Sequence, residues 1–245
     1  NAVRVVPWSS QESPPDGGAG AQRGSRVISI AGHLASQDLI KRSKDMASEL
    51  FGWNEEALEV EEGRVINSGN GDSVSFAELV SRVPEGLTGS GDTKEAPSSP
   101  FTSFAAHVAE VKVDPDTGEV SLLKYTAVHE TGTILNPVGF NGQIEGGIVQ
   151  GIGQALTEII QLDEGQVINP SLAEYKLPTV RDIPELSIHV IESPEGNGPY
   201  KIRGIGDMSI SLPSAAIANA IFDATKVRVT ELPIDASSIY SAING

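Results

Sequence analysis

The sequence contains no cysteine among its 245 residues. A chain without cysteine cannot form a disulfide, a thiolate metal site or an iron–sulfur cluster of its own. It also lacks any apolar run of about 18 residues, the length that a membrane-spanning helix needs. Its formal net charge of −16 argues against nonspecific binding to nucleic acid or to anionic lipid surfaces. If electrons pass through this protein, we expect their carriers to lie on other polypeptides or outside the sequence given.

Several catalytic motifs are absent as well. The sequence has no Gly-x-Ser-x-Gly nucleophile elbow and no phosphate-binding P-loop. Its four histidines have no spacing that suits a metal site. His107 and His189 alternate within expected strands, so we expect them to be ordinary surface or half-buried residues. No signal peptide is visible, and a cytoplasmic protein is expected.

The most informative stretch is the glycine-rich segment 141–160. Its apolar residues follow the spacing of one helix face, at positions 144, 148, 152, 156 and 159. The glycines that interrupt this pattern are Gly142, Gly146, Gly147, Gly151 and Gly153. Each interior glycine costs a helix about 1 kcal/mol relative to alanine, so something must approach the backbone closely. Two interpretations stay open: a core helix packed against a neighbour, or a helix start that cradles a phosphorylated cofactor.

The same stretch resembles the molybdopterin-binding subunit of the xanthine dehydrogenase family, which includes aldehyde oxidoreductases and molybdenum carbon monoxide dehydrogenases. The resemblance rests on Asn136-Pro137, on Gly142-Gln143-Ile144-Glu145-Gly146-Gly147 and on the run from Gln150 to Glu158. It is almost continuous over residues 101–235 and looser over residues 3–83. Family subunits are much longer, so the resemblance implies the C-terminal part of such a subunit.

The resemblance implies a set of cofactor contacts. Gly24, Ser25 and Arg26 match a glycine-rich turn that, in the family, lies against the pterin cofactor just before a helix. Gln143 matches a position whose side-chain amide hydrogen-bonds the cofactor. A hydroxyl, a guanidinium and helix N-terminal amides all suit phosphate. On composition alone, residues 9–25 are a flexible surface loop, and this alternative stays open.

Asp207 is the candidate catalytic residue. In Gly204-Ile205-Gly206-Asp207 it stands where the family carries a glutamate that serves as the active-site base, and Gly204 and Gly206 are candidate cofactor contacts. A carboxylate suits that role because it can accept a proton while the metal lowers the pKa of its bound oxygen. Aspartate is one methylene shorter than glutamate, and catalysis depends steeply on placement. The alternative is a turn aspartate that caps a helix.

Local patterns predict an α+β fold, with helices packed on mixed sheets in two sublobes. Residues 1–83 would form an N-terminal sublobe with the glycine-rich cofactor loop, 84–100 a linker, and 101–245 a C-terminal sublobe. The expected elements are a strand at 3–6, a helix ended by Gly52, hairpins over 58–66 and 104–128, a helix over 76–83 capped by Ser75, a strand over 186–191 and a helix over 213–225.

By resemblance, the chain is part of a molybdenum-dependent oxidoreductase that binds molybdopterin, with the cytosine dinucleotide as one form of that cofactor. The implied reaction is hydroxylation of an aldehyde or N-heterocycle, or oxidation of carbon monoxide, with water as the oxygen source. Expected partners are the remainder of the subunit, subunits that carry FAD and [2Fe–2S] centres, and a small-molecule substrate, but neither nucleic acid nor a membrane. The isolated chain is expected to be inactive. The alternative function is a non-catalytic cofactor-binding or assembly half-subunit.

Overall fold

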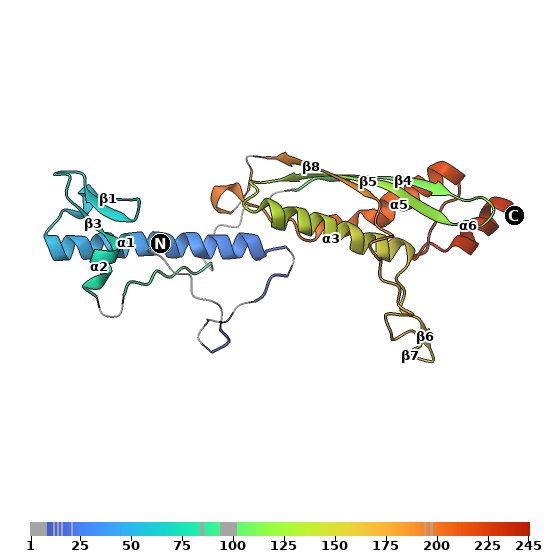
Figure 1. Ribbon diagram of the computed structural model, residues 1–245, viewed down its shortest axis with the longest axis horizontal. Coiled ribbons are helices and arrows are strands. Elements are labelled where there is room, and N and C mark those ends of the chain that lie inside the picture. The colour runs from blue at the N-terminus through green and yellow to red at the C-terminus, as the bar shows by residue number, and fades with distance from the viewer. Residues whose placement is uncertain are drawn as a thin grey trace. The chain divides into compact units, whose positions relative to one another are not determined.

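The computed structural model describes residues 9–11, 13, 15, 17–20, 22–83, 86–93, 102–193, 195–196 and 198–245. It divides into two compact units, Asn1–Ser98 and Ser99–Gly245 (Figure 1). Each unit combines helices with sheet, so the expected α+β class is confirmed. The strand expected at 3–6 lies outside the described residues. The expected domain boundary at 84–100 stays a prediction.

A long helix, α1 (Gly24–Phe51), organises the first unit. It ends as the sequence predicts, because Gly52 adopts a left-handed conformation with φ of +69°. The other elements of this unit are η1 (Glu55–Ala57), β1 (Leu58–Glu61), β2 (Arg64–Asn67), β3 (Ser73–Ser75) and α2 (Phe76–Ser81). The three strands form an antiparallel sheet in the order β1-β2-β3. The Ser75 hydroxyl accepts a hydrogen bond from the Glu78 amide at 3.1 Å, which confirms the expected helix cap.

The core of the first unit lies where the C-terminal half of α1 meets this sheet. Ala47 of α1 is fully buried and packs with side chains from all three strands and from α2, namely Leu58, Val65, Val74 and Leu79. Toward its other end, α1 exposes apolar residues, including 69% of Ile28. Burial of Ala47 thus ties the C-terminal half of the helix to this sheet.

The second unit is built on a three-stranded sheet, β4 (Ala105–Val113), β5 (Val120–Thr131) and β8 (Glu185–Glu192), in the order β4-β5-β8. Strands β4 and β5 form the expected antiparallel hairpin, whose turn is closed by hydrogen bonds from the Asp116 and Thr117 amides to the Asp114 carboxylate. Strand β8 runs parallel to β5. The sheet is therefore mixed, as predicted.

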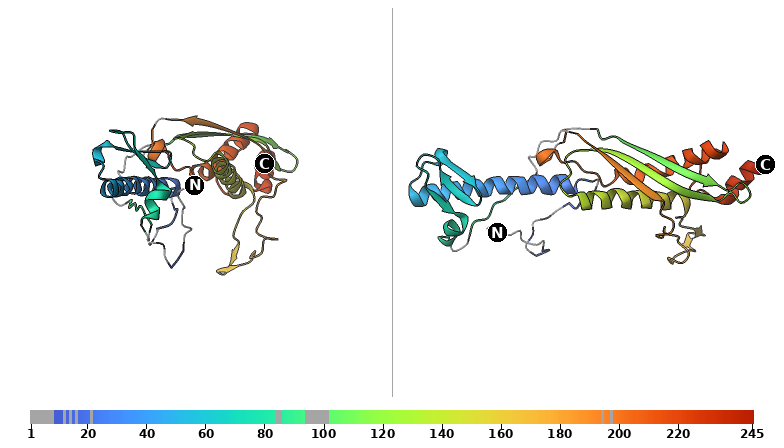
Figure 2. Two further views of the ribbon diagram at one scale, coloured as in Figure 1. Left: turned by 60° about the vertical axis from the view of Figure 1, so that its left-hand side comes forward. Right: turned by 45° about the horizontal axis from the view of Figure 1, so that its top comes forward.

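Helices α3 (Pro137–Leu156) and α5 (Pro213–Thr225) cover one face of this sheet (Figure 1 and Figure 2). Helix α3 connects β5 to the parallel strand β8, as a crossover connection requires. The shared core consists of fully buried side chains from the sheet and both helices, among them Tyr125, Ile144, Ile148, Ile217 and Ile221. The helix expected over 213–225 is confirmed with the same bounds.

Five further elements of this unit were not predicted from the sequence. They are the short hairpin β6 (Leu162–Asp163) and β7 (Gln166–Val167), η2 (Pro199–Lys201), α4 (Met208–Ser211) and α6 (Ala236–Asn244). The hairpin projects from the body of the unit beyond the end of α3 (Figure 1). Within the described ranges, no helix has the length and apolar character needed to cross a membrane.

Candidate functional site

The glycines of α3 fall into two environments. Gly147 and Gly151 are buried, and a β-carbon at Gly147 would overlap the Ser209 hydroxyl. At Gly151 a β-carbon would lie 2.5 Å from Cγ of Pro213. Real β-carbons do not approach other atoms this closely, so these two glycines let α4 and the start of α5 pack directly on the α3 backbone. The packing interpretation accounts for this side of the helix.

A second side of α3 is open. Gly142 and Gly146 are exposed, and a β-carbon at either would meet no described atom within 4 Å. Gln143 and Gln150 are exposed beside Gly146, because they lie three residues before it and four residues after it on the helix. Packing within this unit does not explain glycine at 142 or 146. Open backbone beside amide side chains is what a closely approaching ligand requires.

The predicted base, Asp207, lies at the end of an irregular segment that leads into α4. Its side chain is exposed and makes no capping hydrogen bond to the α4 backbone among the described residues. Its carbonyl oxygen accepts a hydrogen bond from the Ser211 hydroxyl at 3.2 Å. The carboxylate is thus not engaged as a helix cap in this structure.

The structure connects this segment to α3. Ser209 is fully buried, and its hydroxyl donates a hydrogen bond to the Gln143 carbonyl oxygen at 3.3 Å. Asp207 stands two residues before Ser209, and Gly204 and Gly206 stand just before Asp207. The segment that holds Gly204, Gly206 and Asp207 is thus connected to α3 at Gln143, although these three residues are 61 or more positions away from Gln143 along the chain.

The other predicted contacts belong to the first unit. Gly24, Ser25 and Arg26 form the first turn of α1, and this end of the helix has no side-chain cap. The Arg26 Nε and the Gln22 Oε1 atoms are buried without a hydrogen-bond partner among the described residues. An unpaired buried guanidinium N–H is costly, and a phosphate oxygen is its preferred acceptor. The donors at this helix start fit the anionic part of a phosphorylated cofactor.

An ion-pair cluster that the sequence did not reveal lies beside the Asp207 segment. Arg203 has a fully buried side chain, and its Nη1 donates a hydrogen bond to Oε2 of Glu130 at 2.6 Å. Its Nη2 donates to the Ser193 hydroxyl at 2.9 Å, and its Nε donates to the Glu195 carbonyl oxygen. Burial alone would raise the pKa of Glu130, but hydrogen bonds from Arg203 and Ser193 and the charge of Arg203 lower it overall. Glu130 is therefore held as a carboxylate.

A buried polar chain in the core was also missed. Nδ1 of His107 lies 2.8 Å from the Tyr125 hydroxyl, and Nε2 of His107 lies 2.9 Å from Nε2 of His129. Burial and the neighbouring His129 lower the pKa of His107 to about 4, burial also lowers the pKa of His129, and burial raises the pKa of Tyr125. His107 is thus half-buried as expected, but its two hydrogen-bonded neighbours and its lowered pKa distinguish it from an ordinary surface histidine.

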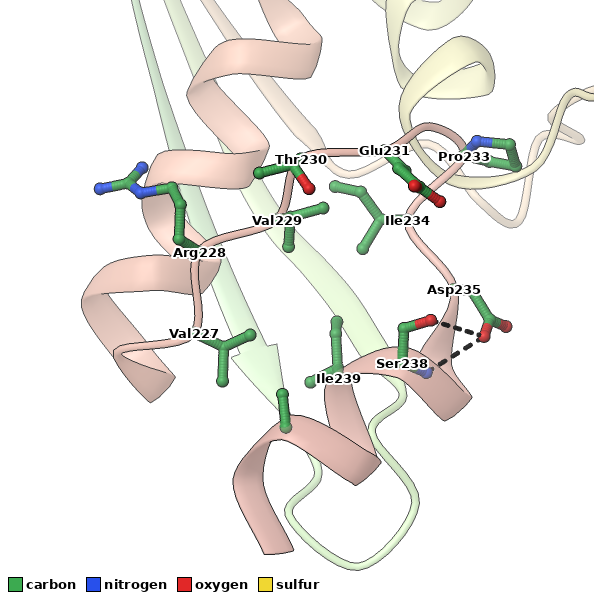
Figure 3. Close-up of a pocket in the computed structure, with 11 residues that line it drawn as sticks. Val227, Arg228, Val229, Thr230, Glu231, Pro233, Ile234, Asp235, Ser238 and Ile239 are labelled. Carbon is green, nitrogen blue, oxygen red and sulfur yellow. Dashed lines mark hydrogen bonds between the residues drawn. The ribbon is translucent and has the colours of Figure 1, made fainter. Parts of the chain in front are cut away.

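The structure also contains a cavity of about 240 Å³ between the segment 227–235 and α6 (Figure 3). Its lining residues include Val227, Val229, Ile234 and Ile239, with Ser238 hydrogen-bonded to Asp235 at the rim. It includes none of the predicted site residues. The candidate chemistry is therefore not located in this cavity.

Comparison with known proteins identifies a family. Residues 1–184 match the family of molybdopterin cofactor-binding domains. The chain is 29% identical over 251 residues to the gamma subunit of the 6-hydroxypseudooxynicotine dehydrogenase complex of Paenarthrobacter nicotinovorans, covering 97% of this chain and 32% of that protein. It is 30% identical over 226 residues to the molybdenum-binding subunit of an aldehyde oxidoreductase of Escherichia coli strain K12. This match covers 90% of this chain and 30% of that protein. The chain thus spans about a third of the length of these relatives.

Solved structures agree with this assignment. Quinoline 2-oxidoreductase from Pseudomonas putida 86 superimposes with a TM-score of 0.80 at 27% identity, over 96% of this chain and 32% of that one. A copper- and molybdenum-containing carbon monoxide dehydrogenase also gives a TM-score of 0.80, and at 22% identity it supports the fold alone. Because the family match covers most of the sequence, the chain belongs to the molybdopterin cofactor-binding domain family.

Proposed function

We propose that this chain is the part of a molybdenum hydroxylase subunit that holds the molybdopterin cofactor and supplies the base, Asp207. The observation that carries the proposal is the open side of α3, where Gly142 and Gly146 leave the backbone accessible beside Gln143. On the packed side of the same helix, Ser209 ties α3 to the segment that bears Asp207, through its hydrogen bond to the Gln143 carbonyl oxygen. A cofactor-binding surface and an exposed carboxylate thus belong to the same framework.

Each residue has a defined role in this proposal. The Arg26 guanidinium and the first-turn amides of α1 would bind phosphate oxygens, and the Gln143 amide would hydrogen-bond the pterin. When bound, the cofactor supplies the redox centre that accepts two electrons from the substrate. The Asp207 carboxylate accepts the proton that the water-derived oxygen loses as that oxygen adds to the substrate carbon. The substrate would be an aldehyde, an N-heterocycle or carbon monoxide.

The partners are part of the same proposal. The chain has no cysteine, so [2Fe–2S] centres and FAD would lie on partner subunits, and the cofactor would be completed by the remainder of the molybdopterin-binding subunit. The relative from Paenarthrobacter nicotinovorans is named as one subunit of a dehydrogenase complex, which supports this arrangement. The cytosine dinucleotide form of the cofactor and the cytoplasmic location stay predictions.

A second candidate function is a non-catalytic half-subunit that binds or assembles the cofactor. The aspartate at 207 favours it, because the carboxylate is one methylene shorter than the family's glutamate and reaches less far from the same backbone. The two candidates agree on cofactor binding and differ only on whether Asp207 takes part in turnover.

The proposed cofactor surface on the open side of α3 can be tested by introducing side chains there in the assembled enzyme. Gly146→Ala and Gly146→Leu place side chains where the protein itself has open space. Alanine should stabilise α3 by about 1 kcal/mol relative to glycine. Cofactor content should nevertheless fall, and fall further with leucine, as measured by molybdenum analysis and by the fluorescence of released pterin.

Gly32 provides the matched control. It is an exposed glycine within α1, and a β-carbon there would also meet no described atom within 4 Å. Gly32→Ala should raise thermal stability and leave the molybdenum and pterin content unchanged. A Gly146→Leu enzyme with full cofactor content would refute the proposed surface.

A further inference from the structure

The segment that carries Asp207 is anchored at its beginning by a buried arginine. Arg203 immediately precedes Gly204, and none of its side chain is exposed. Its guanidinium donates to Glu130 on β5, to the Ser193 hydroxyl and to the Glu195 carbonyl oxygen. These acceptors bind three different nitrogens, so the side chain is held in one orientation.

The backbone just before Arg203 is held against the same end of β5. The Thr133 amide donates to the Lys201 carbonyl oxygen at 3.2 Å, and the Thr133 hydroxyl donates to the Tyr200 carbonyl oxygen at 2.6 Å. Gly132 is required here, because a β-carbon would overlap the Lys201 carbonyl oxygen. Residues 200–203 therefore rest on residues 130–133 through main-chain and side-chain bonds.

The segment is anchored again just beyond Asp207. Ser209 is buried against Gly147 and donates to the Gln143 carbonyl oxygen. Between the two anchors, residues 204–206 lie in no helix or strand, and two of the three are glycine. The two glycines give this segment little conformational preference of its own, so its path depends on its two ends and on Ile205, which packs against the core.

We infer that the Arg203–Glu130 ion pair is a positioning device for Asp207, which fixes the path of residues 204–207. The inference rests on the proposed role of Asp207 as the base. An ion pair with a fully buried arginine and a largely buried glutamate is a weak source of stability because desolvation offsets its attraction, and fixing one conformation is a better-attested use. Because the aspartate side chain is short, the path of the backbone decides where its carboxylate lies. A misplacement of a catalytic group by about 1 Å can lower the rate roughly a hundredfold.

The test uses Glu130→Gln in the assembled, cofactor-loaded enzyme, because this change keeps an acceptor but removes the charge. Amide hydrogen exchange of the peptide that covers residues 204–207 should become about tenfold faster, while exchange in α3 stays unchanged. The kcat should fall by about tenfold to a hundredfold with KM nearly constant, because the defect concerns placement rather than binding. If this variant fails to fold, Ser193→Ala can replace it, because it removes only one acceptor of Arg203. Ser193→Ala should give a smaller increase in amide exchange at residues 204–207 and a smaller fall in kcat.

Glu185→Gln is the matched control. Glu185 pairs with Lys124 at 3.4 Å on the surface of the same sheet, and 71% of the Glu185 side chain is exposed. Removing this charge should leave exchange and kcat unchanged. In an Asp207→Asn background, Glu130→Gln should cause no further loss of kcat, because the residue that it positions is already gone.

Unchanged exchange at 204–207 in Glu130→Gln would overturn the inference, and so would an equal loss of kcat in both backgrounds. The proposed function fails in a different way. A fully active Asp207→Asn enzyme would refute the role of Asp207 as the base, while the exchange measurement would still decide whether the ion pair anchors the segment.

Discussion

At the scale of single residues, the polar chain of His107, Tyr125 and His129 has a consequence for stability. The two imidazoles face each other through Nε2 atoms 2.9 Å apart, so one of these nitrogens must carry a proton and the other must accept it. His129 is 1% exposed, and its Nδ1 has no hydrogen-bond partner among the described residues. Neither ring can gain a proton without charging the core.

This predicts a loss of stability in acid. The folded-state pKa of His107 is about 4, below the value of about 6.5 for the unfolded chain. Between these values the unfolded chain binds a proton that the folded chain does not. The contribution of His107 is therefore complete above pH 6.5 and is lost as the pH falls toward 4. The melting temperature should fall across this window in the wild type and less in His107→Gln.

His189 is the control for this measurement, because it is exposed on β8 and bonds only the Ser187 hydroxyl among the contacts described. His189→Gln should keep the wild-type pH dependence. The wild type and both variants contain the same carboxylates, so the comparison of their melting temperatures isolates the effect of each histidine. An unchanged pH dependence in His107→Gln would contradict this reading of the buried chain.

At the scale of elements, α3 has one packed side and one open side. Gly147→Ala should destabilise the protein by about 1–3 kcal/mol, because the new methyl group would overlap Ser209 in a packed region. Adding Ser209→Gly should restore part of that loss. Thermal or denaturant unfolding would check both changes. A Gly147→Ala protein as stable as Gly146→Ala would contradict the assignment of the two sides.

Periodicity and local capping predicted much of the fold. The alternation in β4 and β5, the Asp114 turn, the Ser75 cap and the glycine at 52 are all local signals, and the structure confirms each. The hairpin β6–β7 was missed because its strands have only two residues each, too few for a periodic pattern. Local signals also did not separate the packed glycines of α3 from the open ones, because that difference depends on where Ser209 and Pro213 lie.

Only those residues of the candidate site that stand in recognisable sequence motifs were predicted. Gln143, Gly204, Gly206 and Asp207 stand in recognisable stretches, and their roles stay predictions. Arg203 and Glu130 are 73 residues apart, and their ion pair exists only once the segment after β8 returns to the end of β5. His107 and His129 were unremarkable in sequence, since only the register of β4 on β5 brings them together.

At the scale of the whole molecule, the proposed function makes the chain one part of a larger enzyme. It spans about a third of the relatives that it matches, and its predicted cofactor contacts are divided between two compact units. Gly24, Ser25 and Arg26 belong to Asn1–Ser98, whereas Gln143 and Asp207 belong to Ser99–Gly245. The chemistry must therefore be measured in the complete enzyme, with its remaining subunit parts and partner chains present.

The measurement that tests the account most directly is the turnover of Asp207→Asn in the complete enzyme at full molybdenum loading. Asparagine keeps the size and polarity of the side chain but removes the proton acceptor. If Asp207 is the base, kcat should fall by at least about a hundredfold, the usual scale for a general base, with cofactor content intact. Asp207→Glu should retain activity, since it keeps a carboxylate. Wild-type turnover by a fully loaded Asp207→Asn enzyme would contradict the account and leave this chain a cofactor-binding part without a catalytic residue.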